Sequence, residues 1–248
     1  MEETIELMLK LMDRVFQDFE HGMPTKPKLV KLPFGSAYRF KEKTIYQAMI
    51  QKLARVQSSV RAAQILLKNG FLQEQAIIHR TIDETNEDII FLARAAANER
   101  ITELHDRFLE AFWEEEIDES GKMIDSEQKR PMIPRKKIHA YLAKDTGFEL
   151  DPSTHQKLIR TISKAYSGFV HGASPHIMDM YGGNPPHFHT KGMLGTHRME
   201  EHADDLWNYV YRSFISHILV GKAIGAERHV EILTNHLHEI ERSVGMHE

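Results

Sequence analysis

The chain has 248 residues and a formal net charge of −4, and it contains no cysteine. Without cysteine it can form no disulfide, no thiolate nucleophile and no cysteine-ligated zinc site. A net negative charge disfavours attraction of the whole protein to nucleic acid, so any such attraction must come from a local basic patch. The N-terminal sequence lacks the basic start of a signal peptide, and no apolar run approaches the roughly 20 residues of a membrane span. We therefore expect a soluble, cytoplasmic protein that does not enter a membrane.

Apolar residues recur every three or four positions through most of the chain, the pattern of amphipathic helices. We expect helices at residues 4–20, 44–69, 71–97, 99–117, 135–145, 152–172, 197–224 and 226–244. Gly22 and Pro24 end the first helix, and Asn69-Gly70 ends the second. The fourth turns Ile101 inward and ends in an acidic run, which opposes the helix dipole and predicts a solvated end.

The chain is expected to form a single domain, 1–248. Its polar stretch 118–134 would connect two sub-layers, 1–117 and 135–248. Glycine and proline interrupt residues 173–195, which predicts an ordered functional loop or a lid. We find no sustained period-two run bounded by hairpin turns. The sequence therefore predicts an all-α, up-and-down bundle of about seven to eight helices.

A polar stripe runs along the helix expected at 152–172. Ser163, Ser167 and His171 recur at four-residue spacing and so share one face, opposite the apolar side of that helix. Such a stripe needs a polar partner. The alternative is structural: His171 precedes Gly172 at the helix end, where the dipole stabilises an imidazolium.

The helix at 71–97 offers a candidate partner for this stripe. Arg80, Glu84 and Glu87 share a face, and Arg80 can pair with Glu84 four residues later. If this face docks on the stripe, Glu84 fixes the tautomer of His171 and the two form a proton-transfer pair. The alternative is a charged face exposed to solvent.

Six histidines lie between residues 171 and 202. His187, His189 and His197 could offer three imidazole nitrogens to a divalent metal, leaving a position open for water. Their spacing matches no established zinc signature, so we predict no metal cofactor. One alternative is a metal-dependent hydrolase that uses these histidines. In a second, purely structural alternative, the histidine rings of the loop pack on Tyr181 and Phe188.

Two segments are basic. Residues 26–43 contain six basic side chains and one acidic one, interleaved with Phe34, Tyr38 and Phe40, and residues 129–137 hold five more basic side chains. Cations beside aromatic rings can hold phosphates and stack bases, as in single-stranded nucleic acid binding. Solvated loops are the alternative.

Apolar side chains dominate one face of the helix at 197–224. They form either core or a dimer interface, and long apolar helices often pair across a two-fold axis. We therefore expect a homodimer. The residues concerned are Leu206, Trp207, Val210, Phe214 and Leu219.

The motif Arg80-x-x-Asp83-Glu84, followed on a later helix by Tyr166-Ser167-x-x-x-His171-Gly172, resembles bacterial helical proteins distantly akin to the HEPN superfamily (higher eukaryotes and prokaryotes nucleotide-binding). The resemblance covers about residues 44–220. It implies an up-and-down helical core, a homodimer, and RNA cleavage or nucleotide binding in defence or toxin systems. Ribonuclease members place an arginine a few residues before the histidine, and this sequence holds none at that spacing.

The resemblance implies roles for individual residues. His171 would be the general base or acid, Arg80 would neutralise a phosphate oxygen, and Glu84 would orient the imidazole. The predicted catalytic residues are His171, Glu84, Arg80 and Ser167, and the predicted substrate-binding residues are Asp83, Glu87, Tyr166 and Lys164. A non-catalytic dimeric interaction module, in which the polar stripe only fixes helix register, is a further alternative.

Overall fold

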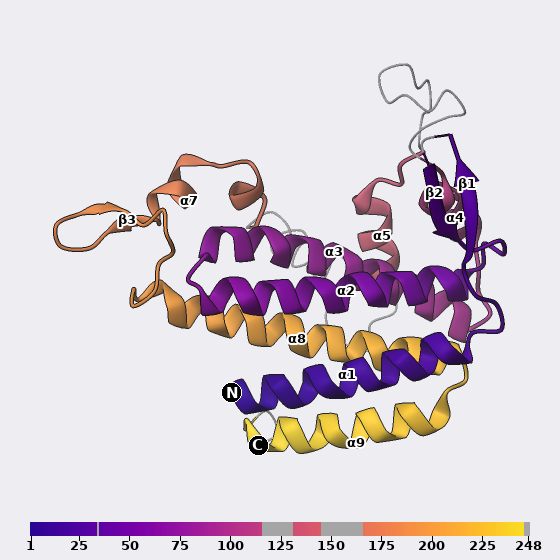
Figure 1. The fold of residues 1–248 in the computed structure, drawn as a ribbon. Coiled ribbons are helices and arrows are strands. Elements are labelled where there is room, and N and C mark those ends of the chain that lie inside the picture. Colours follow the sequence, from indigo (N-terminus) through magenta and orange to yellow (C-terminus); the bar gives the residue numbers. More distant parts are fainter. Residues whose placement is uncertain (34, 116–130, 145–165, 246–248) are drawn as a thin grey trace.

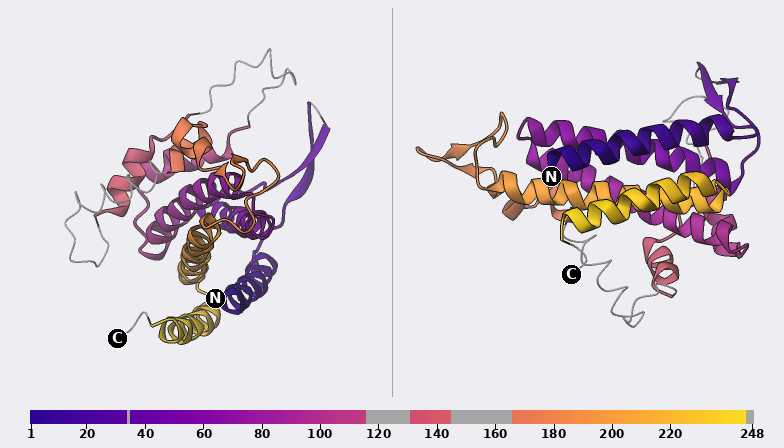
Figure 2. Two further views of the ribbon diagram at one scale, coloured as in Figure 1. Left: turned by 90° about the vertical axis from the view of Figure 1, so that its left-hand side faces the viewer. Right: turned by 90° about the horizontal axis from the view of Figure 1, so that it is seen from below.

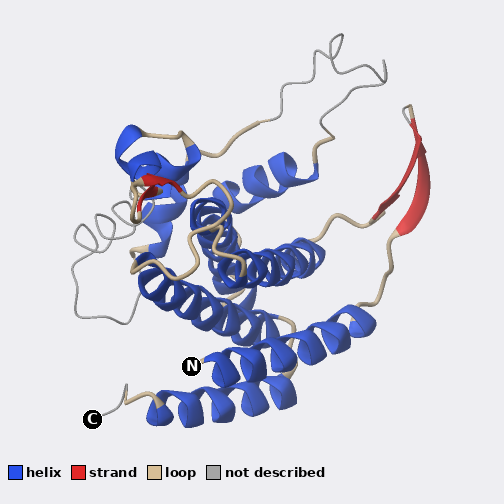
Figure 3. Cartoon of the chain, turned by 60° about the vertical axis from the view of Figure 1, so that its left-hand side comes forward, coloured by secondary structure: helices blue, strands red, loops and turns tan. Residues whose placement is uncertain are grey.

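The computed structural model of this chain describes residues 1–33, 35–115, 131–144 and 166–245. Helices make up most of these residues, and the described strands form two short antiparallel pairs (Figure 3). The predicted all-α helical bundle is confirmed. Within the described ranges, none of the helices combines the length and apolarity needed to cross a bilayer.

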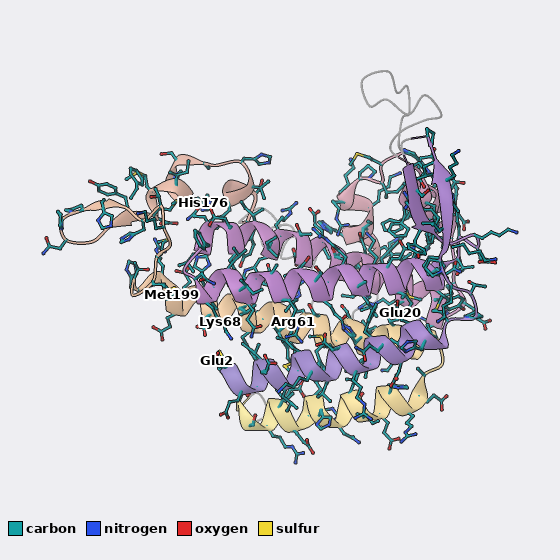
Figure 4. All side chains as sticks on the ribbon, viewed as in Figure 1. Glu2, Glu20, Arg61, Lys68, His176 and Met199 are labelled. Atoms are coloured by element: carbon teal, nitrogen blue, oxygen red, sulfur yellow. The ribbon has the colours of Figure 1, made fainter. Side chains whose placement is uncertain are left out.

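Five long helices form the body of the bundle: α1 (Glu2–Gly22), α2 (Ile45–Lys68), α3 (Leu72–Ala97), α8 (Arg198–Ala223) and α9 (Glu227–Ser243). They lie side by side, and α8 packs against each of the other four (Figure 1). An ion pair between Lys68 and Glu2, 3.2 Å from Nζ to Oε1, joins the end of α2 to the start of α1 (Figure 4). The long helices thus surround α8.

Shorter helices flank this body. They are α4 (Glu103–Trp113), α5 (Arg135–Leu142) and α7 (Ser174–Met178), and residues 166–170 are also helical. Of the helix predicted at 152–172, residues 171–172 form a turn, and residues 152–165, with Ser163 and Lys164, lie outside the described residues, as does most of the predicted connection 118–134. Ile138 of α5 shares one hydrophobic core with the long helices, so residues from both predicted sub-layers pack together.

Local chemistry explains where the helices begin and end. The Thr44 hydroxyl accepts from the Gln47 backbone N–H at 3.4 Å, and the Gln47 side chain accepts from the Thr44 backbone N–H at 2.9 Å, which caps α2. Gly70, with φ +74°, ends that helix as predicted. The predicted start of α4 at residue 99 was wrong. Thr102 forms the cap instead, and Ile101, expected to face inward, is 50% exposed.

The core is built from the apolar faces that the periodicity predicted. Leu206, Val210 and Phe214 of α8 are buried against the other helices of the same chain. Each such side chain contributes about 2 kcal/mol of burial to stability. These residues are therefore core, and α8 no longer supplies a reason to expect a dimer interface.

A β-hairpin stands at one end of the bundle, formed by β1 (Lys28–Leu32) and β2 (Gly35–Arg39) in antiparallel register. The expectation of no strand pair was wrong here. Both strands are short and largely exposed, so they lack the alternating apolar pattern that marks a half-buried strand. The acidic run after α4 was predicted to be a solvated helix end. In the structure one of its residues, Glu115, forms an ion pair with Arg39 of β2.

At the opposite end, residues 173–195 form an arm that contains α7, β3 (Tyr181–Gly182) and β4 (His187–Phe188). The arm extends beyond the ends of the long helices and does not cover the middle of α3 (Figures 1 and 2). It returns to the bundle at the turn between α2 and α3, where the Met193 N–H donates to the Gly70 carbonyl at 2.8 Å. The predicted lid is thus an extension of the bundle in this structure.

Candidate functional site

Helix α3 turns a row of charged side chains into the interior. Asp83, Glu87 and Asp88 are 1%, 3% and 7% exposed. The alternative of a solvated charged face, which concerned Arg80, Glu84 and Glu87, is therefore wrong for Glu87. A buried carboxylate costs several kcal/mol unless a cation and hydrogen bonds compensate. Their partners identify the elements that cover this face.

Helix α5 supplies the first set of partners. Arg135 donates to Glu87 Oε2 and to Asp88 Oδ1, and His139 Nε2 donates to Glu87 Oε2 at 3.0 Å. Lys52 of α2 completes the arrangement with a 2.7 Å contact from Nζ to Asp88 Oδ2. We call these five residues the α3–α5 ion cluster. Its members come from three helices, so it forms only when the bundle closes.

The electrostatics of the ion cluster favour the charged forms of Glu87 and Arg135. Burial by itself would raise the pKa of Glu87, but the hydrogen bond from His139 and the charge of Arg135 outweigh it and lower that pKa. Burial would lower the pKa of Arg135, and the charges of Asp88 and Glu87 outweigh it and raise that pKa. Glu87 Oε1, Arg135 Nε and His139 Nδ1 are nevertheless buried without a hydrogen-bond partner among the described residues. The cluster is thus charged but not fully satisfied.

Helix α8 supplies the partner of Asp83. Arg212 Nη1 lies 2.6 Å from Asp83 Oδ1, so the two side chains form a close ion pair. Burial raises the pKa of Asp83, and the positive charge of Arg212 offsets only part of that effect. Arg212 also lies over the ring of Tyr209, with 5.6 Å between the guanidinium carbon and the ring centroid.

Arg80 and Glu84 form the pair along α3 that their spacing predicts. Arg80 Nη2 and Nε lie 2.6 and 2.8 Å from Glu84 Oε1. Both contacts use the same oxygen, and within the described ranges no side chain donates a hydrogen bond to Oε2 of Glu84. The Glu84 side chain is 38% exposed, so the carboxylate is partly open to solvent.

A cavity of about 330 Å³ adjoins Glu84 and the ion cluster. Helices α2, α3, α4 and α5 and residues 131–133 form its walls. Lys52 connects its charged side to its aromatic side, with Nζ 5.5 Å from the ring centroid of Phe108 and 5.1 Å from that of Phe112. Its lining includes Lys52, Glu84, Asp88, Phe108, Phe112 and Arg135. We call this space the α3–α5 cavity.

The 166–171 segment docks on the bundle through its aromatic side. The Tyr166 hydroxyl donates to Asp205 Oδ2 at 2.7 Å, and its ring lies edge-on to His79 of α3 at 6.1 Å. The ring of Phe169, one turn later, lies edge-on to the ring of His202, with 6.3 Å between the ring centroids. This segment thus meets α3 at His79 and α8 at Asp205, and Tyr166 makes these contacts instead of the serine and histidine of the predicted stripe.

The direction of this segment separates His171 from Glu84. His202, the neighbour of Phe169, donates from Nδ1 to Gln75 at 3.2 Å, near the start of α3. The 166–170 segment therefore runs along α3 from His79 toward Gln75, and its C-terminal end points away from Glu84. His171 is exposed, and within the described ranges no hydrogen bond or ion pair joins it to Glu84.

The other predicted catalytic residue of this segment, Ser167, is half-buried, and it makes no hydrogen bond to Arg80 or Glu84 within the described ranges. The neighbouring Gly168 packs under the ring of His176 of the arm, where an added Cβ would clash. His176 lies at the opposite end of the molecule from Glu20 (Figure 4). The predicted catalytic set is thus divided between the middle of α3 and the base of the arm.

His79 is a buried residue that the sequence analysis missed. It is 0% exposed, its ring stacks on Tyr209 at 4.4 Å, and neither ring nitrogen has a hydrogen-bond partner among the described residues. Burial, and then the nearby His202, lowers the pKa of His79 to about 3, so the ring is neutral. A sequence signal existed. Gln75, His79, Asp83 and Glu87 are spaced every four residues on α3 and are all buried.

The three histidines considered for a metal are not brought together in a ligand cluster. The rings of His187 and His189 are 4.4 Å apart, and His187 Nδ1 donates to the Pro185 carbonyl at 3.0 Å. His197 lies at the start of α8. Among the described residues, no group of three or more histidine, aspartate or glutamate side chains is placed to hold a metal ion.

Three functional candidates come from positions that sequence analysis passed over. Arg135 lies in the basic segment 129–137, whereas His139 and Arg212 belong to none of the sequence patterns described above. No local motif marks them, because each meets α3 only through tertiary packing.

Comparisons of the chain with protein-family models, with curated proteins and with solved structures found no match.

Proposed function

We propose that this chain is a HEPN-like helical protein that binds a nucleotide or RNA, with a base held in the α3–α5 cavity. The observation that carries the proposal is the pairing in one cavity of two aromatic rings, Phe108 and Phe112, with an accessible carboxylate, Glu84. The resemblance of the Arg80-x-x-Asp83-Glu84 and Tyr166-Ser167-x-x-x-His171-Gly172 motifs to HEPN proteins points to the same ligand class.

The chemistry of the cavity suits a nucleobase. Bases stack on aromatic rings with about 1–3 kcal/mol each, and Phe112 is only partly buried. Oε2 of Glu84 can accept a hydrogen bond from a base amino or ring N–H group. Lys52 and Arg135 are already paired with Asp88, so they balance charge in the wall. A neutral, flat and hydrogen-bonding group therefore fits better than a phosphate at this position.

We limit the proposal to binding. Phosphodiester cleavage by the predicted set needs His171 to act beside Arg80 and Glu84. Glu84 pairs with Arg80, whereas His171 is exposed at the base of the arm. The observations that support a ligand site therefore concern α3, α4 and α5.

A homodimer is part of the same proposal, through the HEPN resemblance alone. The apolar residues of α8 that suggested a dimer are used inside the chain. The mass of the particle, from light scattering during size-exclusion chromatography, tests this directly. A strictly monomeric particle at micromolar concentration removes the dimer and leaves the base-binding cavity unaffected.

The proposal is tested by titrating the protein with the four ribonucleoside monophosphates and following heat by calorimetry. We expect saturable binding to the wild-type chain. Phe112→Leu should weaken it at least about fivefold through loss of stacking. Glu84→Gln should weaken binding of bases that donate to the carboxylate.

Matched controls separate the cavity from general effects. Phe71→Leu changes an exposed phenylalanine before α3, and Glu74→Gln removes an exposed carboxylate from α3 itself. Both controls should bind like wild type. If the wild-type chain binds none of the four nucleotides at millimolar concentration, or if the controls lose as much affinity as the cavity variants, the proposal is wrong.

A further inference from the structure

A second cavity lies at the end of the bundle where α1 and α8 end and α2 and α9 begin (Figure 1). Its volume is about 610 Å³, within the range of sites that hold small organic molecules. None of its described lining residues also lines the α3–α5 cavity. We call this space the helix-end cavity. Its walls come from the last turn of α1, residues 23–25, the residues around the start of α2, and the turn between α8 and α9.

The inner wall of the helix-end cavity is apolar. Phe19 and Met23 line it and are only 3% and 8% exposed, so they lie at its inner side. The side chains around them are small: Ala223 and Ala226 flank the turn from α8 to α9, and Gly22 ends α1. An added Cβ at Gly22 would have no neighbouring atom within 4 Å. The space is therefore left open by small residues and closed below by buried apolar ones.

Two carboxylates stand at the open side of this cavity. The Asp18 side chain is 51% exposed, and Glu42 is also exposed. His229 Nε2 donates to Asp18 Oδ2 at 2.9 Å, and within the described ranges no side chain donates to Asp18 Oδ1 or to Glu42. The described lining residues include neither lysine nor arginine. The mouth of the cavity therefore attracts a cation.

The other polar groups near the cavity are used within the fold. Gln47 Nε2 donates to Thr25 Oγ1 at 2.6 Å, and Gln47 Oε1 accepts from the Thr44 backbone N–H at 2.9 Å. Lys26 follows the lining segment in the chain, and its ammonium donates to two backbone carbonyl oxygens at the end of α1. The lysine thus caps a helix and does not neutralise the two carboxylates.

Tyr46 adds an aromatic ring to the lining. It is 41% exposed, and its hydroxyl makes no hydrogen bond within the part of the chain that the structure describes. An ammonium group can lie over a tyrosine ring and can also donate to a tyrosine hydroxyl. The open side of the cavity thus offers a cation both carboxylates and an aromatic face.

We infer that the helix-end cavity binds an amphipathic organic cation, namely a protonated amine attached to an aromatic or other apolar group. The ammonium meets Asp18 and Glu42 at the mouth, and the apolar group lies against Phe19 and Met23. Both carboxylates repel an anion, and a neutral molecule of the same shape lacks the attraction between charges. The inference goes beyond the proposed base site and does not rest on it.

Three ligands that share an indole ring test the preference for charge: tryptamine is a cation at neutral pH, tryptophol is neutral, and indole-3-propionate is an anion. Calorimetry at about 0.15 M salt limits the measurement to charges within about 8 Å. We expect saturable binding of tryptamine, binding of tryptophol that is at least about fivefold weaker, and still weaker binding of indole-3-propionate. Absence of tryptamine binding at millimolar concentration, or equal binding of either other ligand, overturns the inference.

A charge variant and a matched control locate the cation. The double variant Asp18→Asn with Glu42→Gln should weaken tryptamine binding about fivefold and leave tryptophol binding unchanged. The control, Glu20→Gln with Glu227→Gln, removes two exposed carboxylates from the same end of the bundle, where Figure 4 labels Glu20, and neither residue lines the cavity. It should bind tryptamine like wild type. An equal loss of affinity in the control contradicts the inference.

A third variant tests the apolar part of the site. The larger side chain of Ala223→Leu fills part of the cavity, so it should weaken tryptamine and tryptophol alike, by at least about fivefold. Circular dichroism melts confirm that each variant is folded, and unchanged affinity in folded Ala223→Leu would refute the assignment of the cavity. If Glu84→Gln removes tryptamine binding instead, the amine occupies the α3–α5 cavity and the inference is wrong, while the proposed base site stands.

Discussion

Glu87 of α3 and His139 of α5 are joined by a 3.0 Å hydrogen bond from His139 Nε2 to Glu87 Oε2 although both side chains are buried. The same oxygen accepts from Arg135, so one carboxylate holds two side chains of α5. A short helix of this kind cannot be stable in isolation. Its place on α3 therefore depends on these charges together with the burial of Ile138 and Leu142.

Replacing Arg135 with methionine should destabilise the protein by about 3 kcal/mol, because Glu87 and Asp88 lose their shared cation while they remain buried. Lys137→Met, on the exposed side of the same helix, should change stability by less than about 0.5 kcal/mol. Urea unfolding measures both. Adding Glu87→Gln to Arg135→Met should recover part of the loss, and a fully additive double variant would show that the two side chains do not interact.

Glu87 should contribute to the acid sensitivity of the fold. Its pKa is lowered in the folded state, where burial is outweighed by His139 and Arg135. A lowered carboxyl pKa gives stability that is present above the unfolded-state value, about 4.3, and is lost as the pH falls through the folded-state value. The free energy of unfolding of Glu87→Gln should therefore decline less steeply below pH 4.5 than that of wild type. Parallel pH curves would contradict this account.

His79 should cause a loss of stability at higher pH than Glu87 does. Its pKa is about 3 in the folded chain because of burial, against about 6.5 when unfolded. The unfolded chain then binds more protons between these values, so stability falls by about 1.4 kcal/mol per pH unit on acidification from pH 6.5.

The variant His79→Phe keeps the ring that stacks on Tyr209 and removes the titrating group. Denaturant unfolding between pH 7 and pH 4.5 should show a flatter dependence for this variant. The control His238→Phe changes an exposed histidine and should retain the wild-type slope. A variant at position 79 with the full wild-type slope would show that His79 does not titrate as described.

Gly70 should be required for attachment of the arm. Its φ of +74° already disfavours other residues, and an added Cβ would lie 2.7 Å from the backbone nitrogens of Met193 and Leu194. Gly225 has a similar φ of +72° with no atom near its Cβ position. Gly225→Ala should therefore cost about 1 kcal/mol and Gly70→Ala clearly more. Hydrogen exchange should show faster opening of the arm in Gly70→Ala only, and equal effects of both changes would argue against this anchor.

The sequence by itself determined the long helices and their apolar faces. The three-and-four spacing in α1, α2, α8 and α9 needs no knowledge of neighbours, because side chains at that spacing meet on one side of any helix. Gly22, Gly70 and the Thr44 cap act within one turn, so the helix ends are also local. The Arg80–Glu84 pair was predictable for the same reason.

Tertiary structure alone decided what the polar side chains do. A charged stripe on α3 has the same spacing whether it faces water or another helix, so the sequence could not tell that Asp83 and Glu87 are buried. Their partners Arg212, Arg135 and His139 lie about 50 to 130 positions away in the chain, and no local rule connects them. The direction of the 166–170 turn, which leaves His171 at the arm and Tyr166 on α3, is likewise set by packing of rings in three dimensions. Spacing along one helix fixes which residues share a face, but the elements that cover that face are chosen by the fold as a whole.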